Sequence, residues 1–177
     1  WIHCQVRSSR KRHPVELIIP DLSGEAILEE IDHPHTYPVI RAFLSKCSGT
    51  LLLMDALRLK EGEKDQDFFA MKMLSYLCEL DGDKKKGWPT RPVSVVYTKA
   101  DQCDTCFRDP VEFAKKHSPG LWKQCEQRFA SYRCFASGVA GSCAKQMELG
   151  GPTVVPLRVE PRGIIEPFSW LVHEVGL

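Results

Sequence analysis

Residues Val93 to Asp101 read VSVVYTKAD, and this stretch decides the fold class. Its first five residues are mostly apolar and β-branched, which predicts a buried strand, and polar residues follow at once. Gly49 to Asp55 is a second continuous apolar run, of the type found in parallel sheets, and it also ends on a polar residue. Tyr132 to Phe135 is predicted as a further strand, and Val15 to Pro20 as an earlier one that ends at Asp21.

Helical patterns separate these runs. In the first of them Ile40, Phe43 and Leu44 fall on one face, and Pro38 lies near the first turn. The predicted helices are Pro38 to Cys47, Asp65 to Leu80, Val111 to Lys116, Leu121 to Phe129 and Pro167 to Val175. Alternating strands and helices predict an α/β fold, with a mainly parallel sheet and crossover helices on both of its faces.

Other parts of the chain give weaker signals. Trp1 to Val6 has room for one edge strand, and Leu157 to Val159 is a short extended piece. No periodic pattern holds from Ser23 to Tyr37, and Gly141 to Thr153 is predicted as a loop. No internal repeat or linker divides the chain, so residues 1–177 are expected to form one domain.

Composition narrows the function classes. The 177 residues are 43% hydrophobic and 27% charged with a net charge of +1, so no overall field favours a nucleic-acid partner. No run reaches the ~18 apolar residues that a membrane span needs. The basic run from Arg7 to His13 is interpreted as a solvated loop rather than a phosphate or partner site. The eight cysteines are scattered, which favours reduced thiols and a cytoplasmic location.

Ligands of parallel sheets bind at the carboxyl ends of the strands, where this chain places three polar motifs. The first is Asp21-Leu22-Ser23-Gly24. Asp21 can hold Mg²⁺, usually through water. Gly24 can turn its backbone N–H toward a phosphate, because it has no Cβ. A strand that simply ends in a turn explains the same residues equally well.

The second motif is Thr98-Lys99-Ala100-Asp101, and the third is Ala136-Ser137-Gly138. In this order and spacing the three motifs resemble those of the Ras-like P-loop GTPases. The resemblance implies a three-layer P-loop NTPase-like fold that binds GTP or GDP with Mg²⁺. It also implies that Asp101 accepts two hydrogen bonds from guanine and that the stem of Lys99 lies over the base. Thr98 stands where the family has Asn.

The same resemblance gives the third motif a role: the loop Ala136, Ser137 and Gly138 would offer a backbone N–H to the guanine carbonyl. The segment from Val154 to Leu171 is similar to the end of the bacterial double-GTPase families. This narrower resemblance implies protein partners or a second GTPase domain in a larger protein that acts as a GTP/GDP switch.

Two features depart from the family pattern. The phosphate-binding motif G-x-x-x-x-G-K-[ST] does not occur in these residues, and only 14 residues precede Val15. We therefore expect the N-terminal part of the GTPase domain to be missing and the chain alone to be inactive. Glu25 follows Gly24 where many relatives carry a water-positioning Gln, so Glu25 is the candidate catalytic residue. Its negative charge near a phosphate predicts slow hydrolysis. His33 and His35 are expected to be exposed loop residues.

Two other functions remain open. The chain is compatible with a pseudo-GTPase that serves as a protein-interaction scaffold and does not hydrolyse nucleotide. Cys103 and Cys106 have the two-residue spacing of a zinc knuckle, but the chain lacks a second pair at that spacing. A small zinc-stabilised domain is therefore the third hypothesis.

Overall fold

The structure is a computed structural model that describes residues 2–6, 14–19, 23–81, 91–141, 143–148 and 151–176. Two features singled out in the sequence, Asp21 and the basic run from Arg7 to His13, lie outside the described residues.

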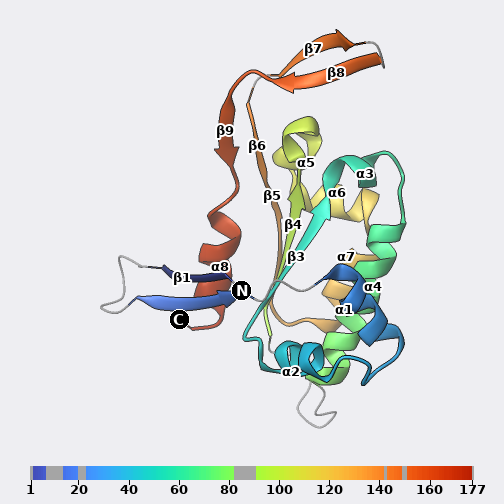
Figure 1. Cartoon of the computed structure of the whole chain (residues 1–177), viewed down its shortest axis with the longest axis vertical. Coiled ribbons are helices and arrows are strands. Elements are labelled where there is room, and N and C mark those ends of the chain that lie inside the picture. The colour runs from blue at the N-terminus through green and yellow to red at the C-terminus, as the bar shows by residue number, and fades with distance from the viewer. Residues whose placement is uncertain are drawn as a thin grey trace.

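The centre of the fold is a parallel sheet of three strands, shown in Figure 1. Its strands are β3 (Thr50–Asp55), β4 (Val93–Thr98) and β5 (Tyr132–Ala136), and β4 lies between the other two. Residues 93–97 of β4 are all buried, as the mostly apolar run predicts. The fold is therefore α/β, and all three strands of this sheet were predicted from the sequence.

Helices cover both faces of the sheet. Neighbouring residues of a strand point to opposite faces, so Tyr132 and Phe135 of β5 face opposite sides. The ring of Tyr132 meets Trp122 at 5.6 Å between centroids, and the ring of Phe135 meets Trp170 at 5.8 Å. Trp122 belongs to α7 (Pro119–Arg128) and Trp170 to α8 (Glu166–Glu174). In Figure 1, α8 lies to the left of the sheet, whereas α7 and α4 (Asp65–Leu80) lie to the right.

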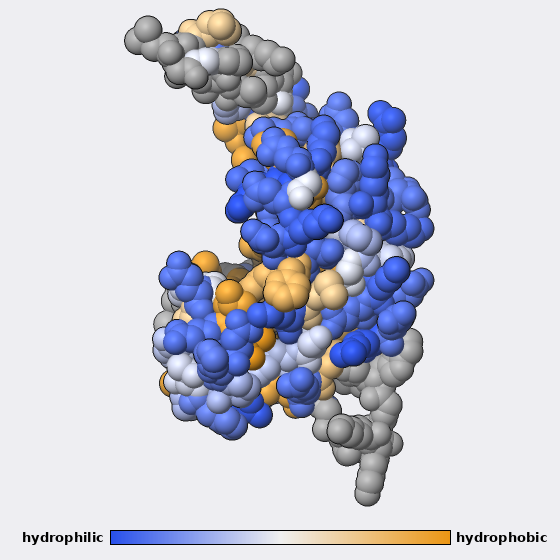
Figure 2. Space-filling model, turned by 90° about the vertical axis from the view of Figure 1, so that its right-hand side faces the viewer, coloured by the Kyte–Doolittle hydropathy of each residue, from blue (hydrophilic) through white to orange (hydrophobic). Residues whose placement is uncertain are grey.

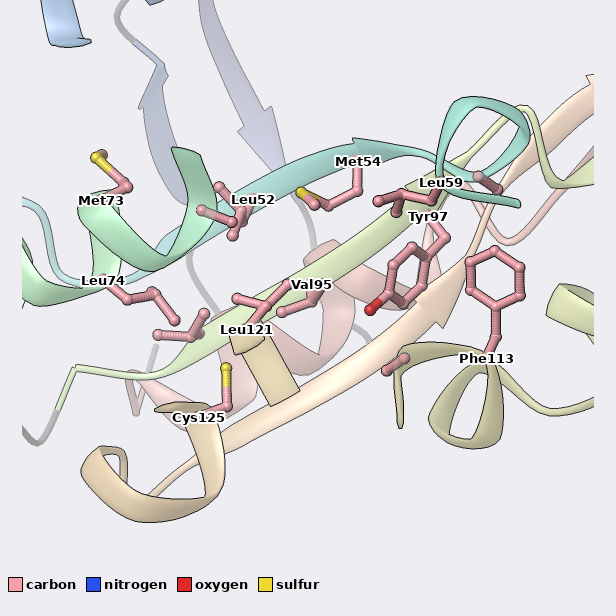
Figure 3. Close-up of a cluster of buried hydrophobic side chains, with 14 of the residues drawn as sticks. Leu52, Met54, Leu59, Met73, Leu74, Val95, Tyr97, Phe113, Leu121 and Cys125 are labelled. Carbon is pink, nitrogen blue, oxygen red and sulfur yellow. The ribbon is translucent and has the colours of Figure 1, made fainter. Parts of the chain in front are cut away.

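The core lies between the sheet and the helices on the right of Figure 1. Alternate strand residues point into it: Leu52 and Met54 from β3, and Val95 and Tyr97 from β4. Figure 3 shows these side chains against residues of three helices, α4, α6 (Pro110–His117) and α7: Met73, Leu74, Phe113, Leu121 and Cys125. The predicted boundaries of α4, Asp65 to Leu80, are confirmed, and its buried residues are Ala70, Met73, Leu74, Tyr76 and Leu77.

The segment from Ser23 to Tyr37 corrects the sequence analysis, because most of it is helical. It forms α1 (Gly24–Asp32), which is followed by α2 (Pro38–Lys46). Ala26, Ile27 and Ile31 of α1 pack against the core, and Glu30 between them has no exposed surface. A buried carboxylate in the middle of the apolar stripe hides the helical period from a sequence reading.

The second correction concerns Gly141 to Thr153, which was expected to be a loop. Most of this segment belongs to an antiparallel pair, β7 (Cys143–Glu148) with β8 (Gly151–Pro156). The flanking strands β6 (Gly138–Ala140) and β9 (Val159–Arg162) form a second antiparallel pair. In Figure 1 the two pairs form one arm, residues 138–162, whose tip projects beyond the rest of the molecule. A further antiparallel pair joins β1 (Ile2–Val6) to β2 (Val15–Ile19). Both predicted strands are therefore present, but they form a two-stranded sheet of their own and are not part of the parallel sheet, which corrects the sequence analysis.

Three short elements follow the sheet strands and were not predicted. They are α3 (Ala56–Lys60) directly after β3, and η1 (Ala100–Gln102) and α5 (Asp104–Arg108) after β4. They place the polar residues at the strand ends on tight turns. In the described part of the chain, every helix is too short or too polar to span a membrane.

Candidate functional site

The carboxyl ends of the three parallel strands meet at one edge, and each end carries a residue of interest. The register pairs Asp55 of β3 with Thr98 of β4, and Tyr97 of β4 with Ala136 of β5. The Thr98 hydroxyl donates a hydrogen bond of 3.0 Å to the Met54 carbonyl, which ties β4 to β3 at this edge.

Two predicted loops are joined directly by backbone hydrogen bonds. Ser137 donates its N–H to the Tyr97 carbonyl at 2.8 Å, and Ala100 donates its N–H to the Ser137 carbonyl at 3.0 Å. Ala136 and Ser137 are both buried. The structure therefore brings the Thr98–Asp101 motif and the Ala136–Gly138 motif together, although more than 30 residues separate them in the sequence.

Gly138 lies against the carboxylate of Asp101. A Cβ at Gly138 would be 2.3 Å from Asp101 Oδ1 and 2.9 Å from the Asp101 backbone N, so no other residue fits without a shift. Asp101 Oδ1 is buried, and it has no hydrogen-bond partner among the described residues. Buried acceptors normally have a donor. Asp101 Oδ1 is one of five buried side-chain polar atoms without a partner among the described residues, and it is the one that belongs to a predicted base motif, which makes it a candidate for a donor supplied by a ligand.

Lys99 adopts a left-handed backbone conformation with φ 54° and ψ 26°, which a non-glycine residue rarely takes. Its side chain reaches back to the neighbouring strand, where Nζ lies 2.5 Å from Asp55 Oδ2. The sequence analysis assigned no role to Asp55. Its position directly after an apolar strand, at the same edge as Thr98, was the signal that would have found it.

Asp55 also begins α3. Its Oδ1 accepts hydrogen bonds from the backbone N–H groups of Leu57 at 3.0 Å and Arg58 at 3.2 Å. Burial raises the pKa of Asp55, but the hydrogen bonds from Lys99, Arg58 and Leu57 outweigh it and hold that pKa below its ordinary value. The carboxylate is therefore ionised at neutral pH and forms an ion pair with the Lys99 ammonium.

The phosphate half of the predicted site is represented here by Gly24 and Glu25, because Asp21 lies outside the described residues. Both residues are exposed in the first turn of α1, and α1 packs against α2 and α4. A Cβ at Gly24 would meet nothing within 4 Å. A carboxylate in a first helical turn is favoured by the helix dipole, which is a structural reason for Glu25.

The two cysteines of the zinc hypothesis are both buried, and Cys103 Sγ lies 3.3 Å from Thr105 Oγ1. Burial and the neighbouring thiols of Cys103 and Cys134 raise the pKa of Cys106 to about 12. Within the described ranges, no group of three or more His, Cys, Asp and Glu side chains is placed to hold a metal ion.

A separate groove of about 310 Å³ lies between α1 and α4. Figure 2 shows the face toward the right of Figure 1, which is largely hydrophilic with apolar side chains gathered near its middle. The groove is lined by Ile31, Asp32, Phe68, Met71, Lys72, Ser75, Tyr76 and Glu79. It shares no residue with the loops at the carboxyl edge of the sheet.

No protein-family model matches this chain, and no curated protein or solved structure matches it either.

Proposed function

We propose that this chain is the base-reading part of a Ras-like guanine-nucleotide-binding GTPase domain, which acts as a GTP/GDP switch in a larger cytoplasmic protein. The observation that carries the proposal is the buried Oδ1 of Asp101, which lies against Gly138 without a hydrogen-bond partner among the described residues. The parallel sheet with helices on both faces is compatible with the Ras-like fold.

Asp101 would select the base. An ionised carboxylate offers two acceptor oxygens, and guanine presents a ring N–H and an amino group side by side. Adenine lacks this pair of donors, so it would leave the carboxylate unpaired, which costs far more than the loss of an apolar contact. The proposed selectivity is therefore for guanine over adenine.

Lys99 and the Ala136–Gly138 loop would complete the base site. The aliphatic stem of Lys99 supplies apolar surface for one face of the ring, as long cationic side chains often do. The backbone of the Ala136–Gly138 loop would offer an N–H to the guanine carbonyl. This loop is held beside Asp101 by the hydrogen bonds of Ser137 to the β4 end and to η1.

Hydrolysis is the less supported half of the proposal. Asp21 would hold Mg²⁺, Gly24 would approach the γ-phosphate and Glu25 would orient water. The Asp21–Tyr37 segment would be the switch that responds to the γ-phosphate. The sequence contains no G-x-x-x-x-G-K-[ST] motif, so in this chain the phosphate contacts would fall to these residues alone.

A second candidate function is a pseudo-GTPase that serves as an interaction scaffold, and the arm favours it. Met147, Leu157 and Val159 are large apolar residues of the arm with 79%, 66% and 80% of their surface exposed. Exposed apolar surface of this kind can serve as a contact site for another protein. A GTP hydrolysis assay on the complete protein separates the two candidates, because only the first predicts turnover.

Base selection can be tested on this chain without a phosphate-binding loop. The probes are guanosine, adenosine and xanthosine, and the measurement is a titration followed by the NMR signals of the nucleoside. We expect guanosine to bind with a Kd of about 1 mM, since base contacts alone provide about 4 kcal/mol. Adenosine should bind at least tenfold more weakly.

Asp101→Asn is the decisive variant, because an Asn amide donates where the carboxylate accepts. It should move the preference from guanosine to xanthosine, which carries a carbonyl oxygen in place of guanine's amino group and so accepts that donor. Asp109→Asn is the matched control, because Asp109 caps α6 and belongs to neither base loop. Equal binding of guanosine and adenosine by the unmodified chain, or an unchanged preference in Asp101→Asn, would refute the proposed function.

A further inference from the structure

The side chain of Lys99 is fixed at both of its ends. Its backbone is in the left-handed region, and its Nζ lies 2.5 Å from Asp55 Oδ2 on the adjacent strand. Because the register pairs Asp55 with Thr98, the side chain of Lys99 crosses the carboxyl edge of the sheet from β4 to β3. It remains 60% exposed, whereas the side chain of Asp55 is 13% exposed.

Asp55, which receives Lys99, is itself held by three contacts, two of them to its carboxylate and one from its backbone. Its Oδ1 accepts the N–H groups of Leu57 and Arg58 as the N-cap of α3. The backbone N–H of Asp55 donates to Gln66 Oε1 of α4 at 2.7 Å. These contacts fix the direction of the carboxylate, so that Oδ2 faces the sheet edge and is left to the Lys99 ammonium.

We propose that Asp55 is a positioning residue for base recognition, which holds Lys99 stretched across the sheet edge so that its stem is a preformed floor for a purine ring. This inference rests on the proposed function, since only that function places a base on Lys99. Asp55 does not touch the base itself and acts through Lys99.

The ion pair is better suited to positioning than to stabilising the fold. Pairs that include a well-exposed partner add little to stability, because solvent screens them. A free Lys side chain has high rotamer entropy, which a ligand would otherwise have to remove when it binds. If Lys99 is ordered before the base binds, this entropy cost is lower. The usual cost of immobilising one side chain on binding corresponds to about a threefold to tenfold gain in affinity.

Asp55→Asn separates positioning from the helix cap. Asn and Asp are equally good N-caps, so the variant retains the acceptor for Leu57 and Arg58. Its amide group presents an N–H donor, instead of an acceptor, to the Lys99 ammonium, so the ion pair is lost. We expect guanosine to bind about threefold to tenfold more weakly in the same NMR titration, with an unchanged thermal unfolding midpoint and an unchanged preference for guanosine over xanthosine.

Lys99→Met tests the same link from the other side and leaves the cap of α3 intact. It keeps an apolar stem of similar length but loses the charge that Asp55 holds, so it should weaken guanosine binding by a similar factor. In the Lys99→Met background, Asp55→Asn should then have no further effect, because the two residues act as one unit. Glu112→Gln is the matched control. It removes the partner of Lys115, another exposed ion pair at 2.6 Å, and should leave guanosine binding unchanged.

The outcomes distinguish this inference from the proposed function. If Asp101→Asn changes base preference but Asp55→Asn or Lys99→Met binds guanosine as tightly as the unmodified chain, the positioning role is wrong and the base site stands. An equal loss from Asp55→Asn with and without Lys99→Met also overturns it, because Asp55 then acts independently of Lys99. If the unmodified chain shows no preference for guanosine, both proposals fail.

Discussion

The hydroxyl of Tyr76 in α4 donates a hydrogen bond of 2.8 Å to Oε1 of Glu30 in α1, a residue with no exposed surface. The same carboxylate accepts the backbone N–H of His35 at 3.0 Å and that of Tyr37 at 2.6 Å. Glu30 therefore links α1 and the turn that leads into α2 to α4 through hydrogen bonds. This is the segment that the proposed switch would have to move.

Tyr76→Phe should destabilise the fold by about 1 to 2 kcal/mol, because it removes a donor from a buried carboxylate without opening a cavity. Urea denaturation followed by circular dichroism measures the change. Tyr37→Phe is the matched control: its hydroxyl donates to the exposed Glu29 at 2.9 Å, so its loss should cost less than about 0.5 kcal/mol. Equal effects of the two variants would contradict the anchoring role of Glu30.

The Glu30 anchor should weaken in acid. Burial raises the pKa of Glu30, but hydrogen bonds from Tyr37, His35 and Tyr76 outweigh it and hold that pKa below its ordinary value. A carboxyl group with a depressed native pKa contributes stability above its unfolded pKa and loses that contribution as the pH falls through the native pKa. The stability difference between the unmodified chain and Glu30→Gln should therefore be constant near neutrality and shrink below about pH 5. Urea denaturation across this range measures it, and a pH-independent difference would be the contrary result.

Gly138→Ala should disturb both stability and the base site. The added methyl group would lie 2.3 Å from Asp101 Oδ1, so the two loops must separate, at a cost of about 1 to 3 kcal/mol. Gly24→Ala is the control for the loss of a glycine, because its methyl group meets nothing and Ala favours a helix. Thermal unfolding should show a lower midpoint for Gly138→Ala and an equal or higher midpoint for Gly24→Ala. An unchanged midpoint in Gly138→Ala would show that the loops can part without cost.

Arg91→Met should be the most destabilising of these changes. The guanidinium of Arg91 is buried, where it pairs with Asp81 and donates to the Leu44 carbonyl at the end of α2. Removing one partner of a buried ion pair costs about 3 to 5 kcal/mol, because the other charge stays in the interior. Arg58→Met breaks the exposed pair with Glu63 and should cost less than about 1 kcal/mol in the same urea titration. A small effect of Arg91→Met would mean that water reaches Asp81.

The central strand of the sheet could be predicted from the sequence because burial on both of its faces leaves a simple record. Every residue from Val93 to Tyr97 is buried, and such a strand shows as a mostly apolar run. Because parallel strands end on the same side of a sheet, the polar residues that follow these apolar runs were expected to lie together at the carboxyl edge. The neighbourhood of Asp101 and Gly138 followed from that argument and from the resemblance to a known family.

The Asp55–Lys99 pair could not be predicted in the same way. It depends on the register between β3 and β4 and on the left-handed backbone of Lys99, and neither leaves a mark in the sequence. Helix α1 was missed because Glu30 interrupts its apolar stripe. The arm was missed because its strands lack the unbroken apolar runs of a buried sheet, although Gly150-Gly151 in the sequence is a recognised hairpin turn signal.

The two ends of the arm, at Gly138 and Gly163, lie at the loops that would bind the base. Gly138 opens β6 against Asp101, and Gly163 follows β9 with φ 65°, where a Cβ would lie 1.8 Å from the Ala136 carbonyl oxygen. These close approaches pack both ends of the arm against the Thr98–Asp101 and Ala136–Gly138 loops. If a protein that binds the arm alters the affinity of the chain for the base, thermodynamic reciprocity requires the base to alter the affinity for that protein by the same factor. Base binding at the loop would then change the affinity of the arm for its protein partner, and partner binding at the arm would change the affinity of the loop for the base.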